Sequence, residues 1–174
     1  MTAFSRSIGI AFLCFFSSEM ALAQTAGAKC QPVSFAGTAQ TLRCDGGLTI
    51  IAENGAQYTL NDTNHDGRVD SVDLSSQAVL LEVPKVPAGK RFTVTTPQAI
   101  AAVRGTRWAV DTTAQKTSVF VVNGRVAVRR RLPAGRDNVV LGPGEGVDVE
   151  SNAPLVVKRW PTARVDALMA RLGQ

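Results

Sequence analysis

Residues 91 to 131, RFTVTTPQAIAAVRGTRWAVDTTAQKTSVFVVNGRVAVRRR, carry the densest pattern of β-strand residues in the chain. Phe92 and Val94 alternate with polar residues, which is typical of a strand with one buried face. Residues 119–122 are apolar at every position and predict a central strand that is buried on both faces. Asn123-Gly124 follows, the pair that best adopts the positive φ angles of a tight hairpin turn. The stretch therefore predicts an all-β domain.

Short strand patterns also occur on both sides of this stretch, separated by Gly, Pro and Asn. They cover residues 48–52, 57–60 and 78–83 before it, and residues 139–141 and 146–149 after it. Many short strands separated by such turn-forming residues are typical of a sandwich, a roll or a solenoid. The pattern alone does not choose between these three architectures.

Only the C-terminal extension, residues 151–174, has the spacing of a helix. Its apolar residues fall on one face of a helix that starts near Pro161: Val165, Leu168, Met169 and Leu172. Such a stripe fits either a basic amphipathic helix on a membrane or partner, or a helix packed on its own domain. We expect the second arrangement, because about 12 residues form only a marginal free helix in water.

Several motifs of the central stretch resemble the FecR domain. They are TPQA at residues 96–99, VRGTRWAV at 103–110, the hairpin at 119–128 and a later VLGPGEG turn at 140–146. We place the FecR-like domain at residues 46–150, and the resemblance implies a single β-solenoid-like or roll-like fold. FecR domains form the periplasmic part of regulators that sense ferric-siderophore receptors. The resemblance therefore also implies a role in signalling.

The chain departs from the plan of those regulators. FecR-type proteins pass the signal to a sigma factor through an N-terminal cytoplasmic segment and one membrane span. Here only a few residues precede the first apolar run, and the receptor-facing C-terminal subdomain is reduced to the short helix. We therefore predict an exported, stand-alone binding or signalling-accessory module whose partner is an envelope protein or polymer. A membrane-anchored regulator of a sigma factor is the alternative.

Residues 1–23 have the layout of a signal peptide. Arg6 supplies the positive charge, residues 8–16 the apolar run, and residues 21–23 the small-x-small cleavage site. The apolar run is shorter than the roughly 20 residues that a membrane span requires. We predict cleavage after Ala23, a periplasmic or secreted protein without a transmembrane helix, and an N-terminal arm at residues 24–45.

The mature chain would keep two cysteines, Cys30 and Cys44. Two cysteines in an exported protein most simply form a disulfide, because the compartment is oxidising. A reduced pair, or a metal or redox pair, is the alternative, although the spacing is too long for a C-x-x-C motif. We predict a disulfide that ties the N-terminal arm to the body of the domain.

The 174 residues carry a formal net charge of +5, and the isoelectric point is about 9.6. A chain of this length fits one domain with a sizeable core. Much of the basic excess lies in the C-terminal half, at residues 129–131, 158–159, Arg164 and Arg171. Basic patches attract nucleic acid, anionic lipid or acidic glycan. An exported protein does not meet nucleic acid, so we predict no nucleic-acid partner and a solvated basic face.

Residues 62–73, DTNHDGRVDSVD, match the twelve-position calcium loop of EF-hands and, more closely, of dockerin modules. Oxygen-bearing residues occupy the ligand positions, and Gly67 stands at the sharp bend. No helix pattern flanks the loop, so it would be an isolated Ca²⁺ loop between strands. A polar turn without metal is the alternative. The candidate metal ligands are Asp62, Asn64, Asp66, Arg68 (through its backbone carbonyl), Asp70 and Asp73.

Catalysis is the weakest interpretation of this sequence, and we predict no catalytic residues. His65 is the single histidine, so no pattern for a catalytic metal or a Ser-His-Asp triad is present. Arg104, Gly105 and Thr106 are candidate binding residues, because glycine admits close approach and arginine bonds bidentately. The alternative for this turn is an internal tie between Arg104 and a carboxylate. A calcium-binding module that recognises a cell-wall or extracellular polymer is the alternative function.

Overall fold

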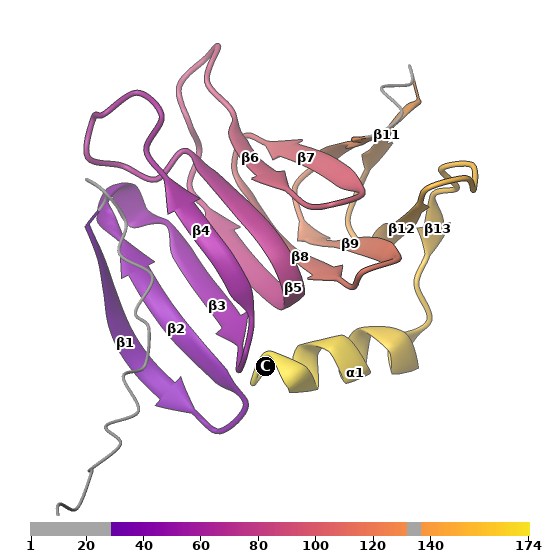
Figure 1. The fold of residues 1–174 in the computed structure, drawn as a ribbon, viewed down its shortest axis with the longest axis horizontal. Coiled ribbons are helices and arrows are strands. Elements are labelled where there is room, and N and C mark those ends of the chain that lie inside the picture. Colours follow the sequence, from indigo (N-terminus) through magenta and orange to yellow (C-terminus); the bar gives the residue numbers. More distant parts are fainter. Residues whose placement is uncertain (1–28, 132–136) are drawn as a thin grey trace, which may run out of the picture.

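The computed structural model describes residues 29–131 and 137–174, which form a strongly curled β-sheet followed by a helix (Figure 1). The predicted signal peptide, residues 1–23, lies outside the described residues. In chain order the elements are β1 (Cys30–Ala36), β2 (Ala39–Cys44), a 3-10 turn (Asp45–Gly47), β3 (Thr49–Glu53), β4 (Gln57–Asn61), β5 (Ser71–Val83), β6 (Phe92–Thr95), β7 (Ala99–Val103), β8 (Thr106–Thr112), β9 (Lys116–Asn123), β10 (Val126–Arg130), β11 (Asn138–Leu141), β12 (Glu145–Glu150), β13 (Lys158–Arg159) and α1 (Thr162–Arg171).

The long strand β5 organises the sheet, because it pairs with four other strands. Its first half pairs with β4 and β6, and its second half pairs with β3 and β8. Gln77, at the change of partners, has a left-handed backbone with φ of 67°. The strand thus passes from one layer of the roll into the other. Layer A has the order β1-β2-β3-β5-β8-β9-β12-β13, and layer B has the order β4-β5-β6-β7-β10-β11.

The main apolar core lies between the two layers. Leu81 and Trp108 of layer A and Val72 of layer B have no exposed surface and belong to one continuous cluster. Alternate residues of each strand face this cluster, because successive side chains of a strand point to opposite sides of the sheet. Burying this cluster is the main source of stability for the domain.

The outer face of layer A is buried as well, because α1 packs against it. In β9, Val119 and Val121 face the main core, whereas Phe120 faces the helix. The prediction that residues 119–122 form a central strand with two buried faces is therefore confirmed. The tight hairpin predicted at Asn123-Gly124 is wrong, because β9 pairs with β8 and β12 in layer A, whereas β10 pairs with β7 and β11 in layer B. Gly124 has a positive φ of 93°, and at this turn the chain crosses from one layer to the other. The cluster under the helix consists of Ala39, Ile51, Ala78, Leu80, Ala109, Phe120, Trp160, Leu168 and Leu172.

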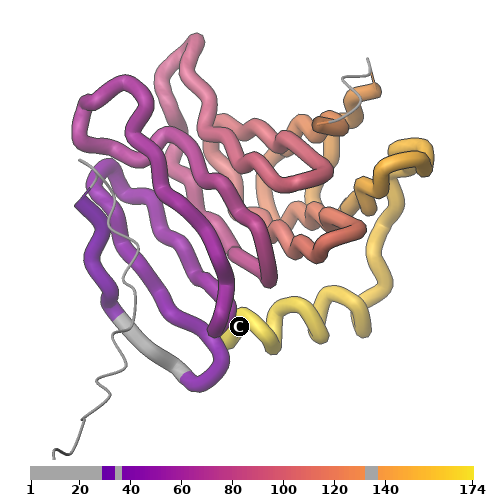
Figure 2. Tube along the Cα trace, in the orientation of Figure 1, coloured from indigo at the N-terminus to yellow at the C-terminus, as the bar shows by residue number. Residues whose placement is uncertain are grey.

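These features confirm the predicted all-β, roll-like domain with a short C-terminal helix. The helix packs on its own domain, as expected, and it crosses layer A from the end of β13 to the turn between β1 and β2 (Figure 2). There the hydroxyl of Thr38 donates to the carbonyl of Ala170 over 3.3 Å. No helix within residues 29–131 and 137–174 is long and apolar enough to cross a membrane.

Trp160 anchors the start of α1 to the sheet. Its ring stacks on Phe120 with 5.1 Å between ring centroids, and the guanidinium of Arg164 lies 3.5 Å from the Trp160 ring centroid. Arg164 also donates from Nη1 to Oδ2 of Asp148 on β12 over 3.0 Å. The indole is therefore held between an aromatic ring and a cation that is itself fixed by an ion pair.

Arg171 anchors the other end of the helix. Its Nε donates to Oε1 of Glu53 on β3 over 2.9 Å, and its Nη1 donates to Oδ2 of Asp111 on β8 over 2.8 Å. The hydrogen bonds to Glu53 and Asp111 hold the pKa of Arg171 above its ordinary value. One guanidinium thus ties the last turn of α1 to two strands of layer A.

The Asp148 ion pair predicts a loss of stability at acid pH. Burial acts to raise the pKa of Asp148, but hydrogen bonds from Arg164 and Ser118 outweigh it and lower the pKa below its ordinary value of 3.8. The contribution to stability is therefore present above about pH 4 and is lost as the pH falls through the lower folded-state pKa. In urea unfolding between about pH 5 and pH 2, the midpoint should fall more steeply for the wild type than for Asp148→Asn. Parallel slopes for the two proteins would contradict this prediction.

The described part of the predicted N-terminal arm is built into the sheet. Strands β1 and β2 form a hairpin, β2 pairs with β3, and the predicted disulfide joins Cys30 to Cys44 at directly opposed positions. The structure thus starts the sheet at Cys30 rather than at Gly46. Gly46 and Gly47 lie in the 3-10 turn between β2 and β3, and these two strands pair with each other.

Candidate functional site

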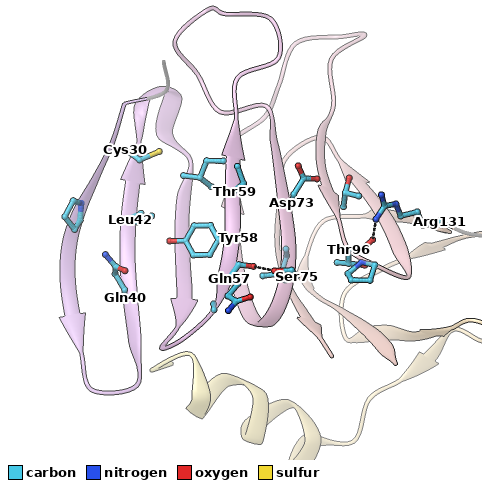
Figure 3. Close-up of a pocket in the computed structure, with 16 residues that line it drawn as sticks. Cys30, Gln40, Leu42, Gln57, Tyr58, Thr59, Asp73, Ser75, Thr96 and Arg131 are labelled. Atoms are coloured by element: carbon cyan, nitrogen blue, oxygen red, sulfur yellow. Dashed lines mark hydrogen bonds between the residues drawn. The ribbon is translucent and has the colours of Figure 1, made fainter. Parts of the chain in front are cut away.

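An open groove of about 810 Å³ runs along strand β4 (Figure 3). One end lies against the inner faces of β1 and β2, and the other end reaches the β6–β7 turn and the end of β10. The groove exists because layer A continues past β5 with three strands, whereas layer B continues with β4 alone.

The two sides of β4 give the groove an apolar wall and a polar wall. Figure 3 shows Tyr58 pointing from β4 toward β2, which carries Leu42. Leu60 and Leu74 continue this apolar wall. Burial raises the pKa of the Tyr58 hydroxyl, so this side chain stays neutral and can donate a hydrogen bond. The polar wall consists of Gln57, Thr59, Asp73, Ser75, Thr95 and Arg131.

Of the predicted binding residues, Arg104 and Gly105 form the β7–β8 turn and Thr106 begins β8, and none of the three lines this groove. Gly105 has φ of 120°, and a Cβ there would lie 3.0 Å from the Cα of Lys85. Arg104 donates from Nε to the carbonyl of Lys90 over 3.2 Å. Arg104 thus holds the β5–β6 connection through a backbone carbonyl. The internal tie to a carboxylate, which was the alternative to a binding role, is not the contact that this hydrogen bond makes. Binding at this turn stays a prediction.

The predicted calcium ligands lie in the β4–β5 loop and at the start of β5. Asp62 accepts the backbone N–H groups of Asp66 (3.1 Å) and Gly67 (2.7 Å). Asp70 accepts both the N–H and the hydroxyl of Thr63. These bonds are typical of polar turns, in which side-chain oxygens cap backbone donors. A cation would have to share or displace these oxygens.

The remaining predicted ligands follow the same pattern. Asn64 Oδ1 accepts the N–H of Asp66 over 2.9 Å, and Asp66 accepts the N–H of Arg68 over 3.0 Å. Asp73 accepts from Asn61 Nδ2 over 2.8 Å. Among residues 29–131 and 137–174, no three His, Cys, Asp or Glu side chains gather closely enough to hold a metal. His65 is exposed in the loop with φ of 58°.

Calcium binding stays a prediction that melting experiments check. If the loop binds with a Kd of about 10⁻⁴ to 10⁻³ M, calcium at about 10 mM should stabilise the protein by roughly 1.4 to 2.7 kcal/mol relative to chelator. The Asp66→Ala variant should show no such difference. Identical wild-type melting curves with calcium and with chelator would remove calcium from the account of this loop.

A buried polar cluster joins the β6–β7 turn to the β8–β9 hairpin, and sequence reasoning missed it. Thr117 Oγ1 lies 2.7 Å from Thr96 Oγ1 and 2.9 Å from Thr112 Oγ1, and it donates to Gln98 Oε1 over 2.7 Å. Gln98 Nε2 donates to the carbonyl of Ala114 over 2.8 Å. All four polar side chains are buried. The TPQ part of the TPQA motif is thus a hydrogen-bonded clasp between the layers, beside the groove residues Thr95 and Pro97.

Replacing Thr117 with valine should lower the free energy of unfolding by about 2 kcal/mol. The change keeps the shape of the side chain but leaves the Thr112 hydroxyl with weaker partners in a buried site. Urea unfolding followed by circular dichroism measures the effect. Thr93→Val is the control, because Thr93 is half-buried on the outer face of β6, where the substitution should change stability by less than about 0.5 kcal/mol. Equal stability of wild type and Thr117→Val would show that the clasp is not stabilising.

The fold is a rolled β-sheet with an open groove along β4, and comparison with known proteins gives its family. The family model described as FecR protein matches residues 34–127, more than half of the chain. The chain therefore belongs to the FecR family, and the resemblance seen in the TPQA and VRGTRWAV motifs is confirmed. The match begins in β1, in agreement with a sheet that starts before Gly46. A search of curated proteins finds no match.

Two solved structures share the fold. Both are crystal structures of a candidate anti-sigma factor from Parabacteroides distasonis, with TM-scores of 0.61 and 0.51 and 19% sequence identity to this chain. They match 80% and 85% of this chain, which in turn covers 64% and 63% of their length. The chain thus spans less than two thirds of those proteins, and at this identity the likeness concerns the fold.

Proposed function

We propose that this protein is a non-enzymatic regulatory module that acts by binding another protein in the cell envelope. The observation that carries the proposal is the FecR family match over residues 34–127. FecR domains are regulatory rather than catalytic, and the similar folds belong to candidate anti-sigma factors. Regulation of this kind works through association with another protein, so a docking surface is the feature to look for.

The groove along β4 supports binding rather than turnover. Its walls combine buried and half-buried apolar side chains with polar groups, most of which are uncharged, and this is the composition of a recognition surface. The charged residues that line it are Asp73 and Arg131. The chain's single histidine, His65, lies outside the lining, so the groove lacks the side chain that most often serves as a general base.

Export to the envelope is part of the proposal. Its support is the signal-like pattern of residues 1–23 and the disulfide between Cys30 and Cys44, since disulfides persist in oxidising compartments. Mass spectrometry of the protein isolated from its source organism should find a mature N-terminus at Gln24. An intact Met1 in a membrane fraction would favour the anchored alternative, and an intact Met1 in the cytoplasm would contradict export.

In-cell photo-crosslinking tests whether a protein partner exists. A crosslinking amino acid is placed at Gln57, in the groove, and separately at Asp166, which is exposed on α1. A discrete adduct with one envelope protein from either position supports the proposal. Adducts with polysaccharide alone would favour the calcium-binding module for an extracellular polymer. Deleting the gene should also change a small set of transcripts, and an unchanged transcript profile would contradict a regulatory role.

A further inference from the structure

We propose that strand β4 is a docking edge onto which an extended segment of the partner protein adds as a further strand of layer B. This inference rests on the proposed function, because it names the place and the mode by which the regulatory module binds its partner. Four observations carry it: the unequal extent of the two layers, the direction of the β4 backbone groups, the poor protection of this edge, and the local charge.

The unequal layers leave room for a strand. Beyond β5, layer A continues with β3, β2 and β1, whereas layer B continues with β4 alone. The inner faces of β1 and β2 therefore lack opposing strands, and their inward residues Cys30, Gln40 and Leu42 are only half-buried. Figure 1 shows β1 and β2 extending past β4. A strand about 4.8 Å beyond β4 would cover this uncovered part of layer A.

The backbone of β4 offers unpaired groups toward that space. The carbonyls of Gln57 and Asn61 accept hydrogen bonds from Ser75 and Asp70, on the β5 side. Because successive residues of a strand direct their N–H and C=O groups to opposite sides, Tyr58 and Leu60 direct theirs away from β5. Within the described part of the chain, β5 is the one strand that pairs with β4. Two residues with one donor and one acceptor each can form four hydrogen bonds with an added strand.

The other outer edges are protected or short, whereas β4 is open. Edge strand β1 carries Pro32 and a register irregularity beside it, and β13 consists of Lys158 and Arg159 alone. Proline, bulges and lysine are the usual devices that keep an edge from pairing. Edge strand β11 has four residues and lines neither pocket. Strand β4, QYTLN, contains no proline and no charge, its register shift against β5 lies at its first two residues, Gln57 and Tyr58, and the groove lies along it.

The charge beside this edge indicates the chemistry of the partner segment. At the C-terminal end of β4 lie four carboxylates, those of Asp62, Asp66, Asp70 and Asp73, against the cations of Arg68 and Lys90. This acidic end contrasts with the formal charge of +5 for the whole chain. The segment that fits has apolar residues at alternate positions, facing Leu42 and Tyr58, and a lysine or arginine at the end that lies near the acidic loop.

A random linear peptide library displayed on phage is the probe for this proposal. Enriched peptides should alternate apolar and polar residues and carry a basic residue near one end. Synthetic versions should lose binding about tenfold or more when alternate backbone nitrogens are methylated, and should tolerate methylation at the positions between. Tolerance at every position, or failure to enrich any peptide that competes at β4, would contradict strand addition.

Two variants at Tyr58 distinguish the contribution of the backbone N–H to peptide binding from that of the side chain. Tyr58→Pro removes an edge N–H and places a ring where the added strand would pair, whereas Tyr58→Ala keeps the N–H. Peptide binding should be at least about tenfold weaker for Tyr58→Pro than for Tyr58→Ala, with both variants showing wild-type circular dichroism. Equal binding by the two folded variants would contradict the proposal. If Tyr58→Pro does not fold, the methylation series on the wild type decides the question.

Two further outcomes identify other occupants or another docking face. Self-association in sedimentation experiments that Tyr58→Pro abolishes would show that a second copy of this chain occupies the edge, and would contradict a partner segment. An envelope-protein adduct from Asp166 but not from Gln57 would keep the proposed function and reject β4 as the docking edge. Absence of adducts from both positions would reject the proposed function itself.

Discussion

Replacing Gly146 with alanine is expected to lower the free energy of unfolding by about 3 kcal/mol. A Cβ at this position of β12 would lie 2.3 Å from Nε1 of Trp160 and 2.8 Å from the carbonyl oxygen of Val119. The indole has little room to move, because Phe120 stacks on it and the Arg164 guanidinium lies against its ring. The added methyl group should therefore push Trp160 from its site and release the start of α1 from layer A.

Urea unfolding and the near-ultraviolet circular dichroism of Trp160 measure this effect. Gly142→Ala is the control, because Gly142 lies nearby in the β11–β12 connection and a Cβ there would lie 3.4 Å from the Glu145 carboxylate, near ordinary contact. The control should change stability by less than about 1 kcal/mol. Equal losses in the two variants would show that Gly146 matters for backbone reasons and not for its contact with Trp160.

Removing the disulfide is the second change with a large expected effect. Cys30 and Cys44 are 14 positions apart, and a cross-link of this span is worth about 3 kcal/mol in the chain-entropy account. The double variant Cys30→Ser/Cys44→Ser should lose about this amount, and the loss should centre on the β1–β2 hairpin because its ladder is clamped at the open end by the disulfide. Hydrogen exchange of the β1 and β2 amides, together with urea unfolding, measures both parts.

Reduction of the wild type provides the control for the disulfide variant. Wild type in reducing buffer should match the double variant in stability, and the double variant should not respond to the reductant. The loss should be greatest in β1, because β2 also pairs with β3. The strands from β3 onward should keep their exchange protection. A double variant as stable as the oxidised wild type would show that the ladder alone holds the hairpin.

Local patterns sufficed to predict the all-β class, the central strand at residues 119–122 and the C-terminal helix. Each of these depends on the period of apolar residues within one segment, and such periods follow from the geometry of strands and helices. The disulfide also followed from residue type, since two cysteines would remain after the predicted signal cleavage. The FecR motifs were recognisable because TPQA and VRGT sit at tight turns where sequence choice is narrow.

The parts that depend on contacts between distant segments were not predictable from those patterns. Strand β5 starts at Ser71, within the acidic loop pattern, and its bend at Gln77 has no glycine to mark it. The clasp of Thr96, Gln98, Thr112 and Thr117 joins residues of ordinary polar character that look exposed when each is considered alone. The groove arises from a mismatch in strand number between two layers, which only the topology reveals.

The acidic loop is the candidate site whose function is hardest to predict from the sequence. The match to a calcium loop depends on residue types at fixed spacing, but those oxygens also cap backbone donors in a turn. Both uses require Asp, Asn and Gly in similar places. Sequence spacing therefore cannot separate a metal loop from a capped turn, and the calcium melt described above is the measurement that does.

The sharing of β5 between the layers bears on how the domain comes apart. Since one continuous strand supplies hydrogen-bond partners to both layers, we expect the strands that pair with β5 to melt together. Amides of β4 and β8 should then exchange through the same opening. A partner strand that binds at one end of β5 should therefore slow the unfolding of the strands at its other end.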